Sequence, residues 1–214
     1  MSSPQVIGIA GNSGSGKTTL ALYLARRLVG SEDAVVSLDA YYLDRRDRRA
    51  SGGELLNFDI PNALDLDLLA DHLLQLARGH PVERPLYDFR THTRLPSTVR
   101  LVPGQTIIVE GRLALQREDV RMHFSPRVFV TADEETCFTR RLTRDIRERG
   151  RTEASVREQW QATVQPMFTR FVEPTRRFAD LVVDGTQPVE TMANAVLQHM
   201  AAGPLTAKIP NTTP

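Results

Sequence analysis

Short apolar runs rich in β-branched residues alternate along this chain with stretches that have the spacing of amphipathic helices. The five clearest runs cover residues 6–10, 34–38, 106–109, 128–131 and 181–183. Each is apolar at nearly every position, as in strands of a parallel sheet that helices cover on both faces. The pattern therefore predicts an α/β fold with a five-stranded parallel sheet flanked by helices.

One helix is predicted together with both of its ends. Asp65 is expected to cap its N-terminus, and Gly79 is expected to terminate it. Between these residues, four leucines recur at helical spacing and should pack in the core: Leu66, Leu69, Leu73 and Leu76.

Three segments do not fit the alternation. Residues 80–103 contain prolines and two short extended patterns, which predict a β-hairpin inserted beside the sheet. Residues 44–53, DRRDRRASGG, have no apolar periodicity and are expected to form a mobile, solvated loop. Residues 201–214 lose all pattern, so we expect a single domain over residues 1–200 followed by a disordered tail.

The composition excludes several classes of partner. The 214 residues include 27 Lys and Arg against 26 Asp and Glu, so no overall charge favours a nucleic acid or an anionic membrane. Cys137 is the only cysteine, which excludes an internal disulfide and a zinc site built on several cysteines. The sequence has neither a signal-peptide pattern nor an apolar stretch long enough to span a membrane, and we expect a cytoplasmic protein.

Residues 11–18, GNSGSGKT, match the phosphate-binding pattern G-x-x-x-x-G-K-[ST] between a predicted strand and a predicted helix. Glycines at these positions let backbone N–H groups approach phosphate oxygens. Lys17 would reach the β- and γ-phosphates, and Thr18 would offer its hydroxyl to Mg²⁺. The segment predicts a P-loop NTPase fold in which ATP or GTP is bound by these residues: Gly11, Asn12, Ser13, Gly14, Ser15, Gly16, Lys17, Thr18 and Thr19.

Two of the predicted strands lead directly into a carboxylate. Residues 106–109 are followed by Glu110, and residues 34–38 are followed by Asp39. The carboxyl ends of parallel strands meet at one edge of the sheet, where ligands of open α/β sheets bind. Each carboxylate alone could also be a helix cap or a turn former. Together with the P-loop, the pattern favours an Mg²⁺ site made of Thr18, Asp39 and Glu110.

Seven blocks in order make residues 6–185 resemble the uridine kinase (uridine-cytidine kinase) family, a branch of the P-loop kinases related to phosphoribulokinase. The blocks are GNSGSGKTT, SLDAYY, NFDIPNALD, PLYDFRTHTR, IIVEG, RRLTRDIRERGR and FVEPTRRFADLVV. The resemblance implies transfer of the γ-phosphate of ATP or GTP to the 5′-hydroxyl of uridine or cytidine. It also implies a homotetramer and feedback inhibition by pyrimidine triphosphates.

The resemblance assigns roles to individual residues. It implies that Asp39 is the general base, with Thr18 and Glu110 as metal ligands. It further implies that Asp59 and Arg141 hold the ribose and that Arg151 and Gln159 close over the substrate. Four residues would surround the pyrimidine: Tyr42, Tyr87, Phe89 and His92. From the residues alone, Tyr87 and Phe89 would be interpreted as the core of the hairpin.

Arginines are concentrated in residues 140–152, which we expect to form a lid over the phosphates. Arg140, Arg144, Arg147 and Arg151 would share one face of a helix. Arginines at this spacing usually form a solvated basic face of a helix. The interleaved Asp145 and Glu148 favour this interpretation for Arg147. Arginines that stabilise a transferring phosphoryl group raise rates by ~10³ to 10⁵. We therefore predict Arg144 and Arg149 as catalytic lid residues beside Lys17, with Gly150 as the hinge.

Two residues depart from the family pattern. Ile60 stands where the family usually has His, and Arg112 stands where it usually has an aliphatic residue. A guanidinium that faces the pocket needs an acidic partner or an anionic substrate, because an unpaired buried charge is very costly. Arg112 could pair with Asp59 or point to solvent. A kinase of the same architecture that acts on another small alcohol therefore stays an alternative.

Two further classes of protein are disfavoured. A nucleotide-driven switch that reads guanine would need an Asn-Lys-x-Asp stretch, which the chain lacks. Residues 50–54, ASGGE, mimic the signature of transporter ATPases but lie too close to the P-loop. A binding protein without catalysis would have no need for Lys17, Thr18, Asp39 and Glu110 together.

Overall fold

The computed structural model describes residues 4–44 and 57–203. Its strands are β1 (Gln5–Gly11), β2 (Val35–Ser37), β3 (Val82–Asp88), β4 (Thr93–Leu101), β5 (Thr106–Glu110), β6 (Arg127–Thr131) and β7 (Leu181–Asp184). Its α-helices are α1 (Lys17–Val29), α3 (Leu66–Ala77), α4 (Glu118–Arg121), α5 (Glu134–Arg149), α6 (Glu153–Gln159), α7 (Gln165–Met167) and α8 (Val189–Ala202). Short 3₁₀ turns are η1 (Glu32–Ala34), η2 (Leu38–Tyr41), η3 (Pro61–Ala63) and η6 (Glu173–Phe178), and π-helical turns are η4 (Trp160–Val164) and η5 (Phe168–Val172).

The main sheet has five parallel strands in the order β2-β5-β1-β6-β7. These are the five strands that the apolar runs predict, and the α/β fold is confirmed. The chain runs from β1 to β2 on one side of the sheet and later crosses β1 to reach β6 on the other side, so β1 borders the point where the strand order reverses. Open parallel sheets bind their ligands at the carboxyl edge of that point.

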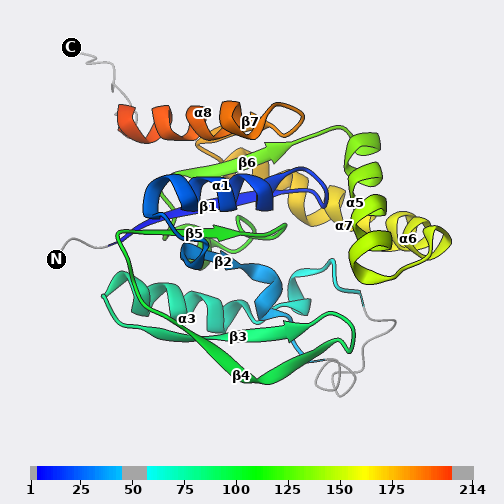
Figure 1. The fold of residues 1–214 in the computed structure, drawn as a ribbon, viewed down its shortest axis with the longest axis horizontal. Helices are drawn as coiled ribbons and strands as arrows, with labels where there is room; N and C mark the ends of the chain where they lie inside the picture. The colour runs from blue at the N-terminus through cyan, green and yellow to red at the C-terminus, as the bar shows by residue number, and fades with distance from the viewer. Residues whose placement is uncertain (1–3, 45–56, 204–214) are drawn as a thin grey trace, which may run out of the picture.

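Helices cover both faces of the sheet, as Figure 1 shows. On one face, α1 and α8 pack through Leu20, Leu24 and Val196 against Ile7, Ile9 and other strand residues. On the other face, α3 packs through its leucines, together with Phe124 and the base of the β3–β4 pair. Both sides of β1 are therefore buried, which explains why the strand runs are apolar throughout.

Helix α3 begins and ends as its sequence predicts. The Asp65 side chain accepts a hydrogen bond from the backbone N–H of Leu68 at 3.1 Å, and Gly79 adopts a left-handed conformation with φ 83° just beyond the helix. All four predicted leucines are buried.

The predicted hairpin forms a separate two-stranded antiparallel sheet, β3–β4, which is not hydrogen-bonded to the main sheet and packs on α3 and η2. Arg94 of β4 holds the hairpin in this position. It donates to the carbonyls of Tyr41 and Tyr42, at 3.1 and 2.9 Å, and to the Asp65 carboxylate at 3.1 Å. The hairpin is thereby attached to the segment that follows β2.

Two predicted segments fall largely outside the described residues. Of the predicted loop 44–53, only Asp44 is described, and it is buried. Helix α8 continues to Ala202, two residues into the predicted tail, while residues 204–214 lie outside the described part of the chain. No helix within residues 4–44 and 57–203 is long and apolar enough to cross a membrane.

Candidate active site

The loop between β1 and α1 has the backbone that its glycines predict. Gly16 is the N-cap of α1 with φ 98°, a left-handed conformation that disfavours other residues. At Gly14, with φ 80°, a Cβ atom would lie 2.2 Å from the carbonyl oxygen of Cys137 in α5. Glycine at position 14 thus allows the loop to touch the first turn of α5.

The loop also leaves donors available at the start of α1. The N-cap of this helix is Gly16, which has no side chain, and the Asn12 side chain accepts from the N–H of Ser13 at 2.8 Å. The Lys17 side chain folds back along the loop, with Nζ 3.4 Å from the carbonyl oxygen of Asn12. The first N–H groups of a helix and its dipole attract anions, so residues 11–18 can form a phosphate cradle.

Glu110 lies at the carboxyl end of β5 and is only 4% exposed. Its carboxylate accepts from the hydroxyl of Thr18 at 3.1 Å and from the hydroxyl of Ser37 at 2.7 Å. Sequence reasoning missed Ser37. The signal that could have found it is strand order, because β2 pairs with β5 and places Ser37 opposite Glu110.

Burial destabilises the charged forms of both Glu110 and Lys17. It raises the pKa of Glu110, although the charge of Lys17 opposes the shift. It lowers the pKa of Lys17, against the charges of Glu110 and then Asp39. A phosphate beside Lys17 and a cation beside Glu110 would each stabilise the charged form.

A cavity of about 830 Å³ opens beside this pair. It brings together fifteen of the predicted site residues: Ser13, Lys17, Thr18, Asp39, Tyr42, Asp59, Tyr87, Phe89, His92, Glu110, Arg141, Arg144, Arg149, Arg151 and Gln159. Five lining residues were not among those predictions: Phe58, Asp88, Arg90, Arg112 and Glu148. The remaining predicted loop residues, Gly11, Asn12, Gly14, Ser15, Gly16 and Thr19, do not line it. Neither does Ile60, so that departure lies outside the cavity wall.

Asp39 does not lie at a strand end as expected, because β2 stops at Ser37 and the chain turns into η2. The Ser37 hydroxyl caps this turn by accepting from the N–H of Asp39 at 3.3 Å. The turn directs Asp39 to the same cavity as Lys17 and Tyr42. Burial, and then the charge of Asp39, raise the pKa of Tyr42 well above its ordinary value, so the phenol stays neutral.

Arg112 faces the cavity and pairs with Asp59, one of the two alternatives that the sequence left open. Its second terminal nitrogen donates to the carbonyl of Val164 at 2.9 Å. The other oxygen of Asp59 accepts from the hydroxyl of Thr163 at 2.8 Å. The guanidinium charge is therefore balanced inside the protein. No sequence pattern pointed to Thr163, which the π-helical turn η4 delivers.

Aromatic rings form one side of the cavity. Tyr42 packs against Phe58, Tyr87 and Phe89, with ring centroids 5.6, 5.4 and 6.3 Å away. Phe58 stacks on His92 at 4.6 Å. Tyr87 and Phe89 thus contribute both to hairpin packing and to the cavity wall, so the two interpretations of these residues are compatible.

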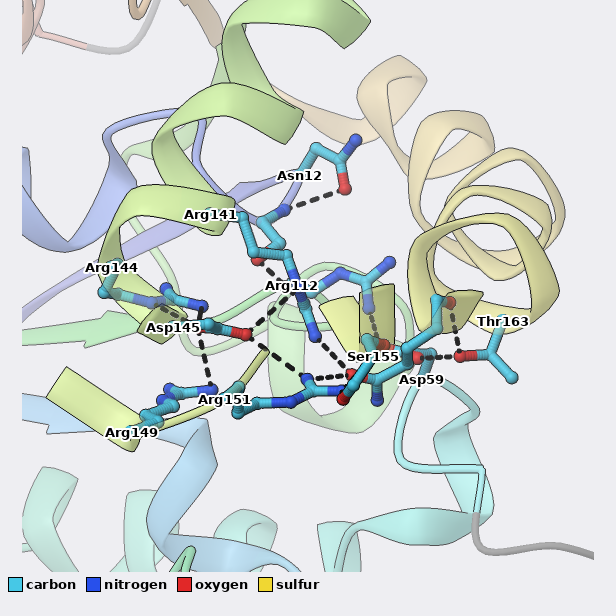
Figure 2. Close-up of polar contacts among 12 residues, drawn as sticks. Asn12, Asp59, Arg112, Arg141, Arg144, Asp145, Arg149, Arg151, Ser155 and Thr163 are labelled. Carbon is cyan, nitrogen blue, oxygen red and sulfur yellow. Dashed lines mark hydrogen bonds and ion pairs between the residues drawn. The ribbon is translucent and has the colours of Figure 1, made fainter. Parts of the chain in front are cut away.

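The arginines of α5 and of the residues just beyond it divide into two groups, and Figure 2 shows the first of them. Arg141, Arg144, Arg149 and Arg151 line the cavity and all pair with Asp145; we call these four the arginine cluster. Arg140 instead donates to the carbonyl of Gly185 at 2.8 Å, and the exposed Arg147 pairs with Glu148. Of the four arginines predicted to share one helical face, Arg140 and Arg147 do not line the cavity, and Arg151 lies beyond the end of α5. The face centred on Asp145 collects arginines four residues before and after it.

Comparisons with known proteins identify relatives of this chain. The model of the phosphoribulokinase / uridine kinase family matches residues 6–192. A uridine kinase of Chloroflexus aggregans is 44% identical over 205 residues, which cover 92% of this chain and 98% of that protein. A uridine kinase of Brevibacillus brevis is 40% identical over 183 residues, 86% of each chain. The solved structure of D-glycerate 3-kinase from Cryptococcus neoformans var. grubii superposes with a TM-score of 0.65 over 88% of both chains and, at 18% identity, shares the fold.

Proposed function

Because the chain belongs to the phosphoribulokinase / uridine kinase family, we propose that it transfers the γ-phosphate of ATP to the 5′-hydroxyl of uridine or cytidine. The observation that carries the proposal is the single cavity of about 830 Å³ whose wall includes both Lys17 of the cradle and Asp59 of the acceptor end. A donor and an acceptor bound in one enclosed site can react without diffusing apart.

At the phosphate end, the cradle and Lys17 hold the triphosphate, and the charge on its β- and γ-phosphates faces the Lys17 ammonium. The donors beside it fit Mg²⁺, because the Glu110 carboxylate and the Thr18 hydroxyl lie 3.1 Å apart and both are oxygen ligands. Such an ion supplies charge neutralisation for the phosphates during transfer. The family resemblance leaves ATP and GTP as donors, and ATP is the donor that we propose.

In the middle of the cavity, Asp39 accepts the proton of the attacking hydroxyl. Phosphoryl transfer needs little covalent help, so positioning and charge stabilisation dominate its catalysis. Arg144 and Arg149 line the same cavity and stabilise the charge that spreads over the transferred group.

At the acceptor end, Asp59 and Arg141 hold the ribose hydroxyls. Tyr42, Tyr87, Phe89 and His92 enclose the base, and Arg151 and Gln159 complete the closure. The pairing of Arg112 with Asp59 removes the need for an anionic acceptor, which favours a neutral nucleoside over a phosphorylated sugar. The homotetramer that the family resemblance implies belongs to the same proposal.

The test is an incubation with Mg²⁺-ATP and a panel of nucleosides and sugars, in which ADP and phosphorylated acceptor are both measured. ADP that forms only with uridine or cytidine supports the proposal. ADP that forms without an acceptor would identify a hydrolase, and phosphorylation of another alcohol alone would refute the nucleoside assignment.

The role of Asp39 has its own test. Asp39→Asn should lower kcat by at least ~10² and leave the affinity for ATP unchanged, because the variant loses the general base but keeps the cradle. Turnover equal to that of the parent protein would remove Asp39 from the mechanism.

A further inference from the structure

Asp145 is a fully buried carboxylate, 0% exposed, to which the mechanism above gives no role. One of its oxygens accepts from Nε and Nη2 of Arg144, at 3.0 and 2.8 Å, and lies 3.5 Å from Nη1 of Arg149. The other oxygen lies 3.4 Å from Nε of Arg141 and 3.4 Å from Nη1 of Arg151. Figure 2 shows this single carboxylate between the four guanidinium groups.

The backbone of Asp145 contributes to the same arrangement. Helix α5 ends at Arg149, and Gly150 follows in a left-handed conformation with φ 63°. The Asp145 carbonyl accepts from the N–H groups of Gly150 and of Arg151, the latter at 3.1 Å. This turn brings Arg151 back toward the carboxylate, so one residue fixes both the end of the helix and the arginine beyond it.

The cluster carries more positive than negative charge. Among the described residues, no other carboxylate forms an ion pair with these four arginines. The second shared acceptor, the Gln159 amide oxygen, is neutral and binds Arg141 and Arg151. The side chains of Arg144 and Arg149 remain 34% and 33% exposed, and both line the cavity. The excess charge therefore faces the place where a triphosphate would lie.

The carboxylate is ionised in this setting. Burial alone would raise the pKa of Asp145, but the charges of Arg141 and Arg144, with the hydrogen bonds from Arg144, outweigh it and lower the pKa. Burial lowers the pKa of Arg141 to about 10, and the charge of Asp145 opposes that shift. Each group thus keeps its partner charged at neutral pH.

On the basis of the proposed function, we propose that Asp145 is a positioning residue for phosphoryl transfer, which holds the arginine cluster in place before the triphosphate arrives. Without it, four like charges repel one another and separate in the free protein. The arginines would then have to be gathered during each turnover, and preorganised charge is what makes electrostatic stabilisation effective. Asp145 acts through the arginines and does not itself contact the phosphates.

The first experiment compares Asp145→Asn with the parent protein. The variant keeps the shape of the side chain and loses its charge. We expect kcat to fall about 10- to 100-fold and KM for ATP to change by less than about threefold, because one more net positive charge still attracts the nucleotide. Glu135→Gln, an exposed residue on the same helix, is the matched control and should keep its kcat within twofold. A rise in KM at constant kcat would overturn the proposal.

The second experiment separates positioning from a merely structural role. If Asp145 acts through the arginines, the loss of kcat in the double variant Asp145→Asn/Arg144→Met should be smaller than the product of the two single losses, because Arg144 is already absent and only the positioning of the other arginines is still lost. Independent effects would multiply and would refute the coupling. The double variant also removes one of the repelling charges, so it provides the test if Asp145→Asn alone does not fold.

The third experiment does not depend on the reaction. Phenylglyoxal modification of the nucleotide-free protein, followed by peptide mass spectrometry, measures how accessible each arginine is. Asp145→Asn should increase the modification rate of Arg144 and Arg149 several-fold, while Glu135→Gln leaves it unchanged. Equal rates would refute the proposal. If the parent protein phosphorylates no acceptor, the proposed function fails but this labelling result still decides the role of Asp145.

Discussion

The phosphate cradle and the arginine cluster line one cavity and meet where Arg141 donates to the Ser13 hydroxyl at 3.1 Å, yet they are built in different ways. The cradle is a contiguous segment, residues 11–18, whose shape is set by backbone conformation and by the start of α1. The arginine cluster is set by side chains that converge on one buried carboxylate from positions 141 to 151. The cradle therefore depends on the course of the backbone, and the arginine cluster depends on the balance of charge among its side chains.

This difference indicates how each side responds to change. Backbone N–H groups persist when a neighbouring side chain is replaced, so the backbone shape of the cradle should tolerate most single substitutions outside its glycines, whereas Lys17 and Thr18 also act through their side chains. Ion pairs that share one acceptor are coupled, so the loss of one member changes the rest. The same reasoning applies at the acceptor end, where Arg112, Asp59 and Thr163 form a second side-chain network.

The largest expected effect is on the arginine side. Arg144→Met should lower kcat by about 10³, or about 4 kcal/mol, because the guanidinium stabilises the transferred phosphoryl group. Steady-state kinetics with saturating ATP and acceptor measure this loss. Arg147→Met is the control, since Arg147 is exposed and pairs only with Glu148 among the described residues; it should stay within twofold. A kcat for Arg144→Met above one tenth of the parent value would show that the cluster is dispensable.

The next effect concerns stability at the acceptor end. Arg112→Met should destabilise the protein by about 3 kcal/mol, because it leaves the 6% exposed Asp59 side chain without its ion-pair partner. Urea unfolding measures the change, and Arg112→Met/Asp59→Asn should recover part of it because the unpaired charge is gone.

The matched control for that prediction is an exposed ion pair. Arg117→Met breaks contacts with Asp67 and Asp119, whose side chains are 91% and 51% exposed, and should cost less than about 1 kcal/mol. Equal stability losses for Arg112→Met and Arg117→Met would contradict the idea that burial makes the side-chain network sensitive.

The smallest effect is expected beside the cradle. Ser37→Ala removes the hydrogen bond to Glu110, which is worth about 0.5–1.5 kcal/mol, together with the cap on the N–H of Asp39, and it leaves the backbone of the cradle intact. We expect a three- to tenfold increase in the Mg²⁺ concentration needed for half-maximal activity. Ser31→Ala removes a similar cap at an exposed turn and should leave the Mg²⁺ dependence unchanged. A loss of kcat as large as that of Arg144→Met would show that the cradle is as sensitive to side-chain changes as the arginine cluster.

The features that were predicted correctly are those determined by residues close together in the sequence. The five strands, the capped helix α3, the hairpin and the glycines of the cradle depend on local pattern. The sequence left the contacts of Arg112 open, because pairing with Asp59 and exposure to solvent were both chemically reasonable. Only the course of the folded chain decides between them.

The features that were missed depend on distant segments. Ser37 meets Glu110 because β2 and β5 are adjacent, and Thr163 meets Asp59 because a π-helical turn delivers it. Asp145 was interpreted as a residue that interrupts a basic stripe. Its central place depends on which face of α5 is buried, and a shift of one residue in that face exchanges Arg140 for Arg141.

The contact between Gly14 and the Cys137 carbonyl also restricts how α5 can move. A methyl group at position 14 would already collide with the helix, so the first turn of α5 cannot advance toward the loop. The contact therefore fixes how near the start of α5 lies to the P-loop, and through the helix it fixes where Arg141 and Arg144, one and two turns farther along, stand relative to the cradle.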